Sequence, residues 1–359
     1  MLKKIVLVFV GFLATMPTLV RAIDLREYLF VDTSRQQAEV SGQFDFKSGN
    51  QEQASFNGTV RSSYAVTYST LPFAWKLDFS GQAAISRNGT NDAETEKEYT
   101  LRAQTSADKY FPGFTFLNRH DFLGFGALDL GYRKSKSDEK AEDPYVKAEI
   151  GIGLGRIIDA TDLAKATRLI DDLQQYGVIN RELSQQGYFD LAEIIGAENT
   201  FKKEYRLDEY QKYWFETIET VLQQNGVLTS GALGALGMIR LQEVLINLPF
   251  STNRSHGHLS KIGIGYIISN YADSDAAVPT LDLSYAYALP FSTYQWQFAD
   301  RVGYSLTVSN FSHQFTNALS ATYAVSLQID WENTWNLTYT IPDQGNNTLA
   351  NELTSVLKY

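Results

Sequence analysis

The sequence predicts a mainly β fold: a transmembrane antiparallel β-barrel of about 12 strands, within a range of 10 to 14, interrupted by an inserted α-helical domain. Three observations predict it. Apolar and polar residues alternate with a period of two over long segments in both halves of the chain. Aromatic residues are abundant, with 21 Tyr, 21 Phe and 5 Trp, although the mean hydropathy is only −0.24. Polar linkers between the segments alternate between short and long, as a barrel that crosses a membrane requires.

The first residues have the pattern of an export signal. Two lysines precede an apolar run over 5–13, which is about half the roughly 20 residues that a membrane-spanning helix needs. Val20 and Ala22 place small residues at the −3 and −1 positions of a cleavage site. We therefore expect residues 1–22 to be a signal peptide and the mature chain to begin at Ile23. An uncleaved membrane anchor is the alternative.

Charge and cysteine content exclude several kinds of partner and site. Cleavage would remove Lys3, Lys4 and Arg21 from the 31 basic residues, against 41 acidic ones, which leaves a formal net charge of −13. This charge argues against nucleic acid as a partner. Because the chain has no Cys, it has no disulfides, no thiolate metal sites and no lipid-modified N-terminal cysteine.

Residues 23–155 are expected to form the first half of the barrel. In the clearest segment, Phe73, Trp75 and Leu77 lie on one face and Lys76 and Asp78 on the other, which fits a strand with a lipid side and a polar inner side. The expected strands cover 38–46, 56–68, 73–85, 99–105, 122–132 and 146–154.

Residues 251–359 are expected to form the second half. Asp300 interrupts the apolar face of one of its segments. The expected strands cover 262–268, 281–289, 294–308, 319–331, 335–341 and 353–359. Long linkers follow the odd-numbered strands, and short turns, over 69–72, 109–113, 290–292 and 332–333, follow even-numbered ones. Aromatic residues gather beside the short turns, as at a membrane interface, and these turns and both termini should face the periplasm.

Between the two halves, residues 156–250 switch to a period near 3.6, which predicts an inserted helical domain. A first helix is expected to begin with Asp159 or Thr161 as its cap and to end at Gly177, and Ser184 should cap a second helix. A third helix is expected over 207–224 and a fourth, fully buried one over 231–246. Because six strands precede the domain, it should lie on the periplasmic side. Its length leaves open whether it hangs there or folds back as a plug.

With its exported start, its alternating strands and its closing segment Asn351-Glu-Leu-Thr-Ser-Val-Leu-Lys-Tyr359, the chain resembles Gram-negative outer-membrane β-barrels as a class. The segment over 40–50 is similar to the opening hairpin of small salt-induced outer-membrane barrels. The resemblance implies location in the cell outer membrane, contact with outer-membrane lipid, and an assembly signal with Leu357 and Tyr359 that the barrel-assembly machinery reads. Ser355 departs from the alternating apolar pattern of that signal.

Few residues offer catalytic or metal chemistry. Ser255, His256 and His258 begin one strand, but neighbours in a strand point to opposite faces, so the Ser and His do not align for an outer-membrane hydrolase. Two imidazoles without a third ligand make a weak metal site, and we interpret them as solvated turn histidines. His120 is the other histidine that a hydrolase could use. We expect no enzyme activity, metal or cofactor, because phosphate loops, nucleophile elbows and HExxH sequences are missing.

Charged residues of both signs are expected to face the lumen. Such charges must be either solvated or paired, so we expect a water-filled passage or a core closed by ion pairs. They are Asp45, Lys47, Arg61, Lys76, Asp78, Arg102, Lys147, Glu149, Lys261, Asp282, Asp330 and Glu352. We expect a channel, or an export or uptake component, whose periplasmic helices gate the lumen or dock a periplasmic protein. The alternatives are a closed structural or assembly barrel that recruits an envelope partner and, third, the hydrolase.

Overall fold

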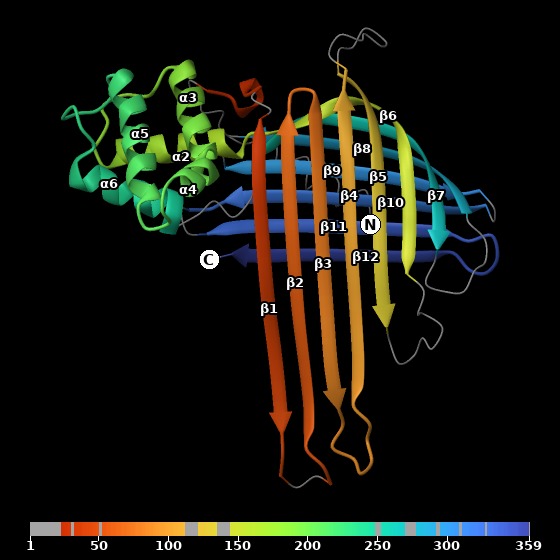
Figure 1. Cartoon of the computed structure of the whole chain (residues 1–359). Helices are drawn as coiled ribbons and strands as arrows, with labels where there is room; N and C mark the ends of the chain where they lie inside the picture. Colours follow the sequence, from red (N-terminus) through yellow and green to blue (C-terminus); the bar gives the residue numbers. More distant parts are fainter. Residues whose placement is uncertain are drawn as a thin grey trace, which may run out of the picture.

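The computed structural model describes residues 23–29, 32–49, 52–111, 121–134, 144–247, 253–269, 278–291, 295–308, 311–326 and 329–358. These residues form one 12-stranded antiparallel sheet and a helical domain inserted between its sixth and seventh strands (Figure 1). The expected signal peptide, His120 and Tyr359 lie outside the described residues.

Each strand of the sheet pairs with the next one in sequence, which confirms the mainly β, antiparallel fold. The strands are β1 (Thr33–Lys47), β2 (Ser55–Thr70), β3 (Phe73–Arg87), β4 (Glu96–Tyr110), β5 (Phe122–Lys134), β6 (Tyr145–Asp159), β7 (Ser255–Ser269), β8 (Val278–Phe291), β9 (Trp296–Thr307), β10 (Ser312–Ala324), β11 (Asp330–Ile341) and β12 (Thr348–Lys358). They run longer than the roughly 5 or 6 residues of an ordinary globular strand. No pairing joins β1 to β12 within the described residues, so each has one free edge.

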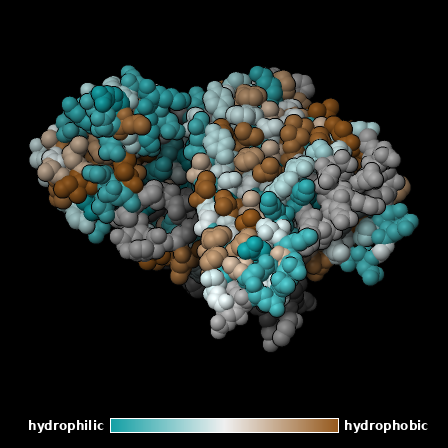
Figure 2. Space-filling view, turned by 60° about the horizontal axis from the view of Figure 1, so that its bottom comes forward, coloured by the Kyte–Doolittle hydropathy of each residue, from teal (hydrophilic) through white to brown (hydrophobic). Residues whose placement is uncertain are grey.

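The alternation in the sequence gives the sheet one apolar and one polar face. Ile150 on β6 lies opposite Ile264 on β7, and their side chains are 73% and 68% exposed. Leu353 on β12 is 76% exposed on the same face. Figure 2 shows apolar surface over the sheet, whereas much of the helical domain is hydrophilic. A sheet with this much exposed apolar surface needs an apolar environment or a partner on that side.

The sheet bends strongly near β6 and β7, so that the first and last strands run in different directions in Figure 1. Glycines on the polar face make the close approach possible. A Cβ atom at Gly151 would lie 2.2 Å from the carbonyl oxygen of Ile262, and one at Gly263 would lie 2.3 Å from Oε1 of Glu149. The polar face is concave here, because Lys261 on β7 reaches Asp108 on β4.

The helical domain consists of α2 (Thr161–Gln175), α3 (Gln185–Gly196), α4 (Glu198–Glu204), α5 (Tyr210–Gln224), α6 (Gly234–Gln242) and a π-helical turn (Glu243–Asn247). Its core is apolar and includes the fully buried Leu169 and Ile218. Ser184 caps α3 as predicted, accepting a hydrogen bond from the Gly187 amide at 3.1 Å. Gly177, with φ +69°, follows α2, as expected.

The prediction that the fourth helix is fully buried was wrong. Leu236 and Ile239 on α6 are 48% and 59% exposed, and only Gly237 and Leu241 of this helix are buried. The physical reason is position: α6 lies at the margin of the domain, where α2 covers one of its sides (Figure 1).

Other boundaries also differ from the prediction. β6 continues to Asp159, so residues 156–159 belong to the sheet rather than to the helical domain. The short turn expected over 109–113 lies partly outside the described residues; β4 ends at Tyr110 and β5 begins at Phe122. In the described parts of the chain, no helix is long and apolar enough to cross a membrane.

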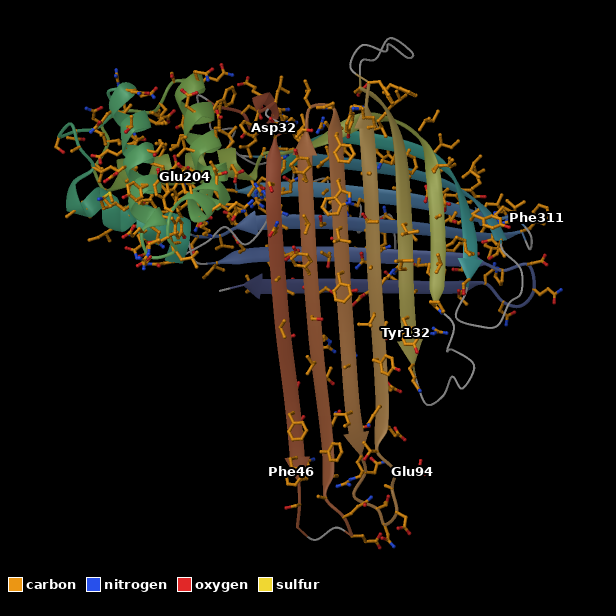
Figure 3. The ribbon with its side chains drawn as sticks, viewed as in Figure 1. Asp32, Phe46, Glu94, Tyr132, Glu204 and Phe311 are labelled. Atoms are coloured by element: carbon orange, nitrogen blue, oxygen red, sulfur yellow. The ribbon has the colours of Figure 1, made fainter. Side chains whose placement is uncertain are left out.

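The helical domain lies at the end of the sheet where β1 begins. Figure 3 shows Asp32 at this end, while Phe46 and Glu94 lie at the opposite end, far from the helices. The two-residue turn between β2 and β3 is also at the helical end. We call this end of the sheet the helical end.

Candidate functional site at the helical end of the sheet

The twelve charged residues predicted to face the lumen all lie on the polar face, because each alternates along its strand with residues of the apolar face. These residues are Asp45, Lys47, Arg61, Lys76, Asp78, Arg102, Lys147, Glu149, Lys261, Asp282, Asp330 and Glu352. The structure brings only some of them together. Arg61 instead donates to Gln82 at 3.3 Å, and Asp45 accepts from Gln43 at 3.2 Å.

One ionic cluster joins β6 to β8 across β7. Nζ of Lys147 lies 2.8 Å from Oδ2 of Asp282 and 3.9 Å from Oε2 of Glu149. Thr280 donates to the same Asp282 oxygen at 2.7 Å. The cluster spans β7 at Gly265, where a Cβ atom would lie 2.4 Å from Thr280 Oγ1. Because Gly265 has no side chain, side chains from the neighbouring strands β6 and β8 can contact each other over β7.

A second cross-face contact joins β4 to β7. Nζ of Lys261 lies 2.6 Å from Oδ1 of Asp108, and it also lies 4.7 Å from the ring centroid of Phe125. Phe125 forms a small buried cluster with Leu123 and Tyr110. The concave face is therefore filled by side chains between β4 and β7.

Arg156 links β6 to the turn between β2 and β3. Its guanidinium donates to the carbonyl oxygens of Leu71 and Thr70 at 2.9 and 2.7 Å, and to the hydroxyl of Ser69 at 2.6 Å. It also lies over the ring of Tyr110, 4.2 Å from the centroid. These contacts tie one wall of the concave face to the opposite wall at the helical end.

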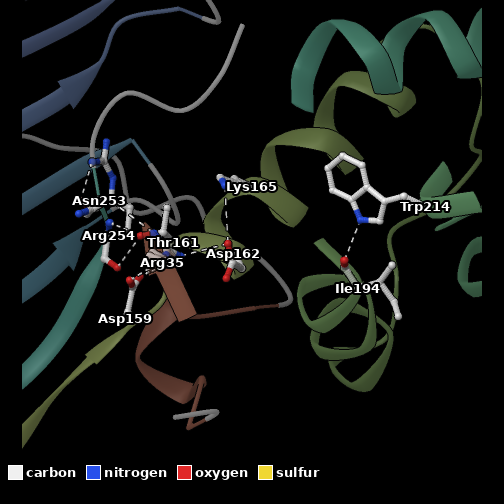
Figure 4. Close-up of polar contacts among 9 residues, drawn as sticks. All are labelled: Arg35, Asp159, Thr161, Asp162, Lys165, Ile194, Trp214, Asn253 and Arg254. Atoms are coloured by element: carbon white, nitrogen blue, oxygen red, sulfur yellow. Dashed lines mark hydrogen bonds and ion pairs between the residues drawn. The ribbon is translucent and has the colours of Figure 1, made fainter. Parts of the chain in front are cut away.

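Arg35 on β1 connects the first strand to the helical domain (Figure 4). Its Nε lies 3.1 Å from Oδ2 of Asp159, and its terminal nitrogen lies 3.1 Å from Oδ1 of Asp162 on α2. Asp159 also accepts from the Thr161 amide at 2.9 Å. The N-cap of α2 is Ala160, which makes no side-chain capping bond, so the prediction of Asp159 or Thr161 as the cap was wrong. We call this arrangement of Arg35 with Asp159 and Asp162 the Arg35 clamp.

Arg254 fixes the return from the helical domain into β7, and its side chain is fully buried. It donates to Thr322 Oγ1 on β10 at 3.1 Å and to the carbonyl oxygen of Gln295 at 3.0 Å, and its amide donates to Thr161 Oγ1 at 2.9 Å. Burial lowers the pKa of Arg254 to about 10, with the nearby charge of Asp330 opposing that shift. The guanidinium therefore stays charged at neutral pH, and its hydrogen bonds hold both ends of the helical insertion against the sheet.

The segment before β1 packs between the helices and the sheet, which the sequence did not predict. Ile23, Leu25 and Tyr28 are buried within the core of the helical domain. Nε2 of His256 lies 2.8 Å from the carbonyl oxygen of Tyr28, so the ring donates to it. Burial raises the pKa of the Tyr28 phenol, which stays protonated.

The interpretation of His256 as a solvated turn histidine was wrong, because its side chain is buried under the N-terminal segment. Ser255, the neighbour considered for a hydrolase, has its amide bonded to Gln297 Oε1 at 2.9 Å. Among the residues that the structure describes, no group of three or more His, Asp or Glu side chains could hold a metal ion.

Sequence reasoning missed several residues of this site for identifiable reasons. Arg35 and Asp108 lie in strands that run further than the alternation indicated, and Arg156 was assigned to the helical insertion. Asp129, which pairs with Arg102 at 2.6 Å, lies on β5, opposite a charge on the neighbouring strand β4. The sequence signal that could have identified these residues was opposite charge at positions predicted to face inward.

No protein-family model matches this chain, and no curated protein sequence matches it. The geometry of the helical end is therefore the basis for a functional proposal.

Proposed function

We propose that the chain is an outer-membrane β-barrel whose concave face lines a passage for solutes or polymers, and that the helical domain closes this passage at the periplasmic end. The observation that carries the proposal is the Arg35 clamp, which holds α2 to β1 at the helical end. Arg156 adds a second tie between opposite walls there. The ion-paired Arg35 and the hydrogen-bonded Arg156 at one mouth suit a gate, because partly exposed guanidinium contacts can exchange for water when the mouth opens.

Insertion into a membrane is supported by the outer surface. Apolar side chains are exposed along it, and Trp75, Trp296 and Trp331 lie within the first three residues of β3, β9 and β11, at the helical end. In lipid every backbone amide and carbonyl needs a partner, so β1 and β12 must pair with each other to close the barrel. The even strand number makes that pairing antiparallel.

Single-channel conductance in planar bilayers tests the gate. The first variant lacks residues 161–252, with Ala160 joined to Asn253 by a short turn, so that β6 and β7 stay whole. We expect brief or small steps from the mature chain and larger, longer steps from the variant. No steps from either protein would contradict a passage.

A point variant tests the Arg35 clamp in the full chain. Arg35→Gln removes both ion pairs and should increase the fraction of time spent open. Arg61→Gln is the matched control, because Arg61 lies on the same face, on β2, and among the described residues its side chain has only the neutral Gln82 as a hydrogen-bond partner. Equal open fractions in the two variants would rule out gating by the Arg35 clamp.

A second candidate function is a closed barrel that recruits an envelope protein through its helices. The exposed Leu236 and Ile239 on α6 favour it, since isolated helical domains rarely leave neighbouring large apolar side chains uncovered. A photo-crosslinking residue at Ile239 in intact cells should then yield one defined adduct, which the Leu236→Gln change weakens. No adduct at Ile239, or the same adduct from the exposed Lys212 on α5, would contradict it.

A further inference from the structure

The outer, apolar face of the sheet carries an uneven distribution of polar side chains. Asp300 on β9, Asn317 on β10, Asn333 on β11 and Asn351 on β12 all lie on this face, because they pair opposite or alternate with its apolar residues. In the described strands β1 to β8, no outward position holds an Asp, Glu or Asn. We call these four residues the outer polar patch.

The outer polar patch is only partly satisfied within the chain. Asn317 donates to Asp300 Oδ1 at 2.7 Å, and the indole of Trp335 donates to Asn351 Oδ1. Among the described residues, this leaves the second oxygen of Asp300, one amide hydrogen of Asn317 and both amide hydrogens of Asn351 without a hydrogen-bond partner. In the part of the chain that the structure describes, the side chain of Asn333 has no hydrogen-bond partner. Facing lipid hydrocarbon, such groups are costly, and polar residues within membrane spans mark places of contact.

We propose that the outer face of β9–β12 is the interface between two copies of this chain in the membrane; this inference rests on the proposed membrane barrel. A two-fold interface brings the same surface to both sides, so donors and acceptors of the outer polar patch are present in both copies. The free amide hydrogen of Asn317 is complementary to the second oxygen of the partner's Asp300, and a contact between them would be reciprocal by symmetry. An Asn carboxamide both donates and accepts, so Asn333 and Asn351 are also complementary to themselves.

The surroundings of the outer polar patch suit a protein interface. Trp331, Trp335, Leu353 and Leu357 flank it with exposed apolar side chains. Interfaces combine aromatic anchors with a few well-placed polar groups, and inside a membrane hydrogen bonds between such groups help to hold the partners. A second copy supplies the same aromatic residues and the same amides.

Disulfide crosslinking tests the interface directly, since the chain has no Cys of its own. Asn333→Cys and Asn351→Cys are made separately in the full chain and oxidised in membranes. Ile150→Cys is the control, because Ile150 is at least as exposed on the outer face but lies on β6. We expect disulfide-linked dimers from at least one of the first two variants and none from the control. Monomers from both, an adduct with a different protein, or equal dimer yield from the control would overturn the proposal.

The mass of the protein–detergent complex supplies a second test. We expect a dimer for the mature chain and a monomer for the double variant Asp300→Leu with Asn317→Leu, which removes the polar pair without adding charge. A monomer for the unchanged chain, or no change of mass on substitution, would overturn the interface.

Extraction of the same membranes with alkaline carbonate separates the two proposals. If the unchanged chain stays with the membrane pellet as a monomer, the interface fails and the barrel stands. If the chain is released into the soluble fraction, the membrane barrel itself fails.

Discussion

The concave face of the sheet has two regions that are built from the same alternating sequence but differ in how their charges are used. On β1 to β3, Arg61, Lys76 and Asp78 are exposed, and no ion pair joins them within the described residues. On β4 to β8, Lys147 and Lys261 are mostly buried and each is paired with a carboxylate from a non-adjacent strand. We call the first region, on β1 to β3, the solvated wall. We call the second, on β4 to β8, where charges pair across the face, the zipped region.

The difference follows from backbone shape rather than from charge content. β6 and β7 carry glycines on the concave face, and their missing side chains let neighbouring strands bend toward each other. On β1, Gly42 lies on the outer face instead, and an added Cβ atom there would have only ordinary contacts, at 3.7 Å or more. Alternation therefore decides which residues face inward, whereas glycine placement decides whether they meet.

The largest expected effect comes from removing a cation from the zipped region. Lys147→Met leaves Asp282 and Glu149 close together without their shared positive partner. We expect a loss of about 3 kcal/mol in the free energy of unfolding, since breaking a buried pair strands a charge. Urea titration of the reconstituted protein, followed by Trp fluorescence, measures it.

Lys76→Met is the control for that change, because Lys76 lies on the solvated wall. We expect a change within about 0.5 kcal/mol there. A similar loss for both variants would contradict the division of the concave face into two regions.

A smaller effect is expected from adding one methyl group where the sheet bends. Gly151→Ala would place Cβ 2.2 Å from the carbonyl oxygen of Ile262 and 2.7 Å from Cα of Gly263. Both are backbone atoms that cannot rotate away, so we expect a loss of about 2 kcal/mol in the free energy of unfolding. The same urea titration measures this loss.

Gly42→Ala provides the comparison on β1, where Gly42 lies on the outer face between Val40 and Phe44. There the added methyl group meets nothing closer than 3.7 Å, and reduced freedom of the unfolded chain should stabilise the protein by about 0.5 kcal/mol. If Gly151→Ala is tolerated equally well, the bend does not depend on the glycines.

The sequence predicted the parts of this molecule that depend on local pattern. Alternation located all twelve strands, and capping chemistry located the start of α3 at Ser184. It did not predict which charged residues would meet, because Lys261 and Asp108 are brought together by the bend across two intervening strands. The burial of Leu25 and Tyr28 was missed for a related reason: a short segment without periodicity gives no signal of what it will pack against.

The smallest expected loss of stability within the zipped region, and the sharpest test of the comparison, comes from a hydrogen bond. Thr280→Val keeps the shape of the side chain but removes the donor to Asp282 Oδ2. We expect a loss of about 1 kcal/mol, which is typical of one hydrogen bond to a group that keeps other partners, here Lys147.

Combining Thr280→Val with Lys147→Met tests whether the two contacts act together. Because both residues bind the same oxygen, the combined loss should differ from the sum of the separate losses, as coupled contacts require. Strict additivity would mean that Asp282 is already solvated, and the zipped region would then be no different from the wall formed by β1 to β3.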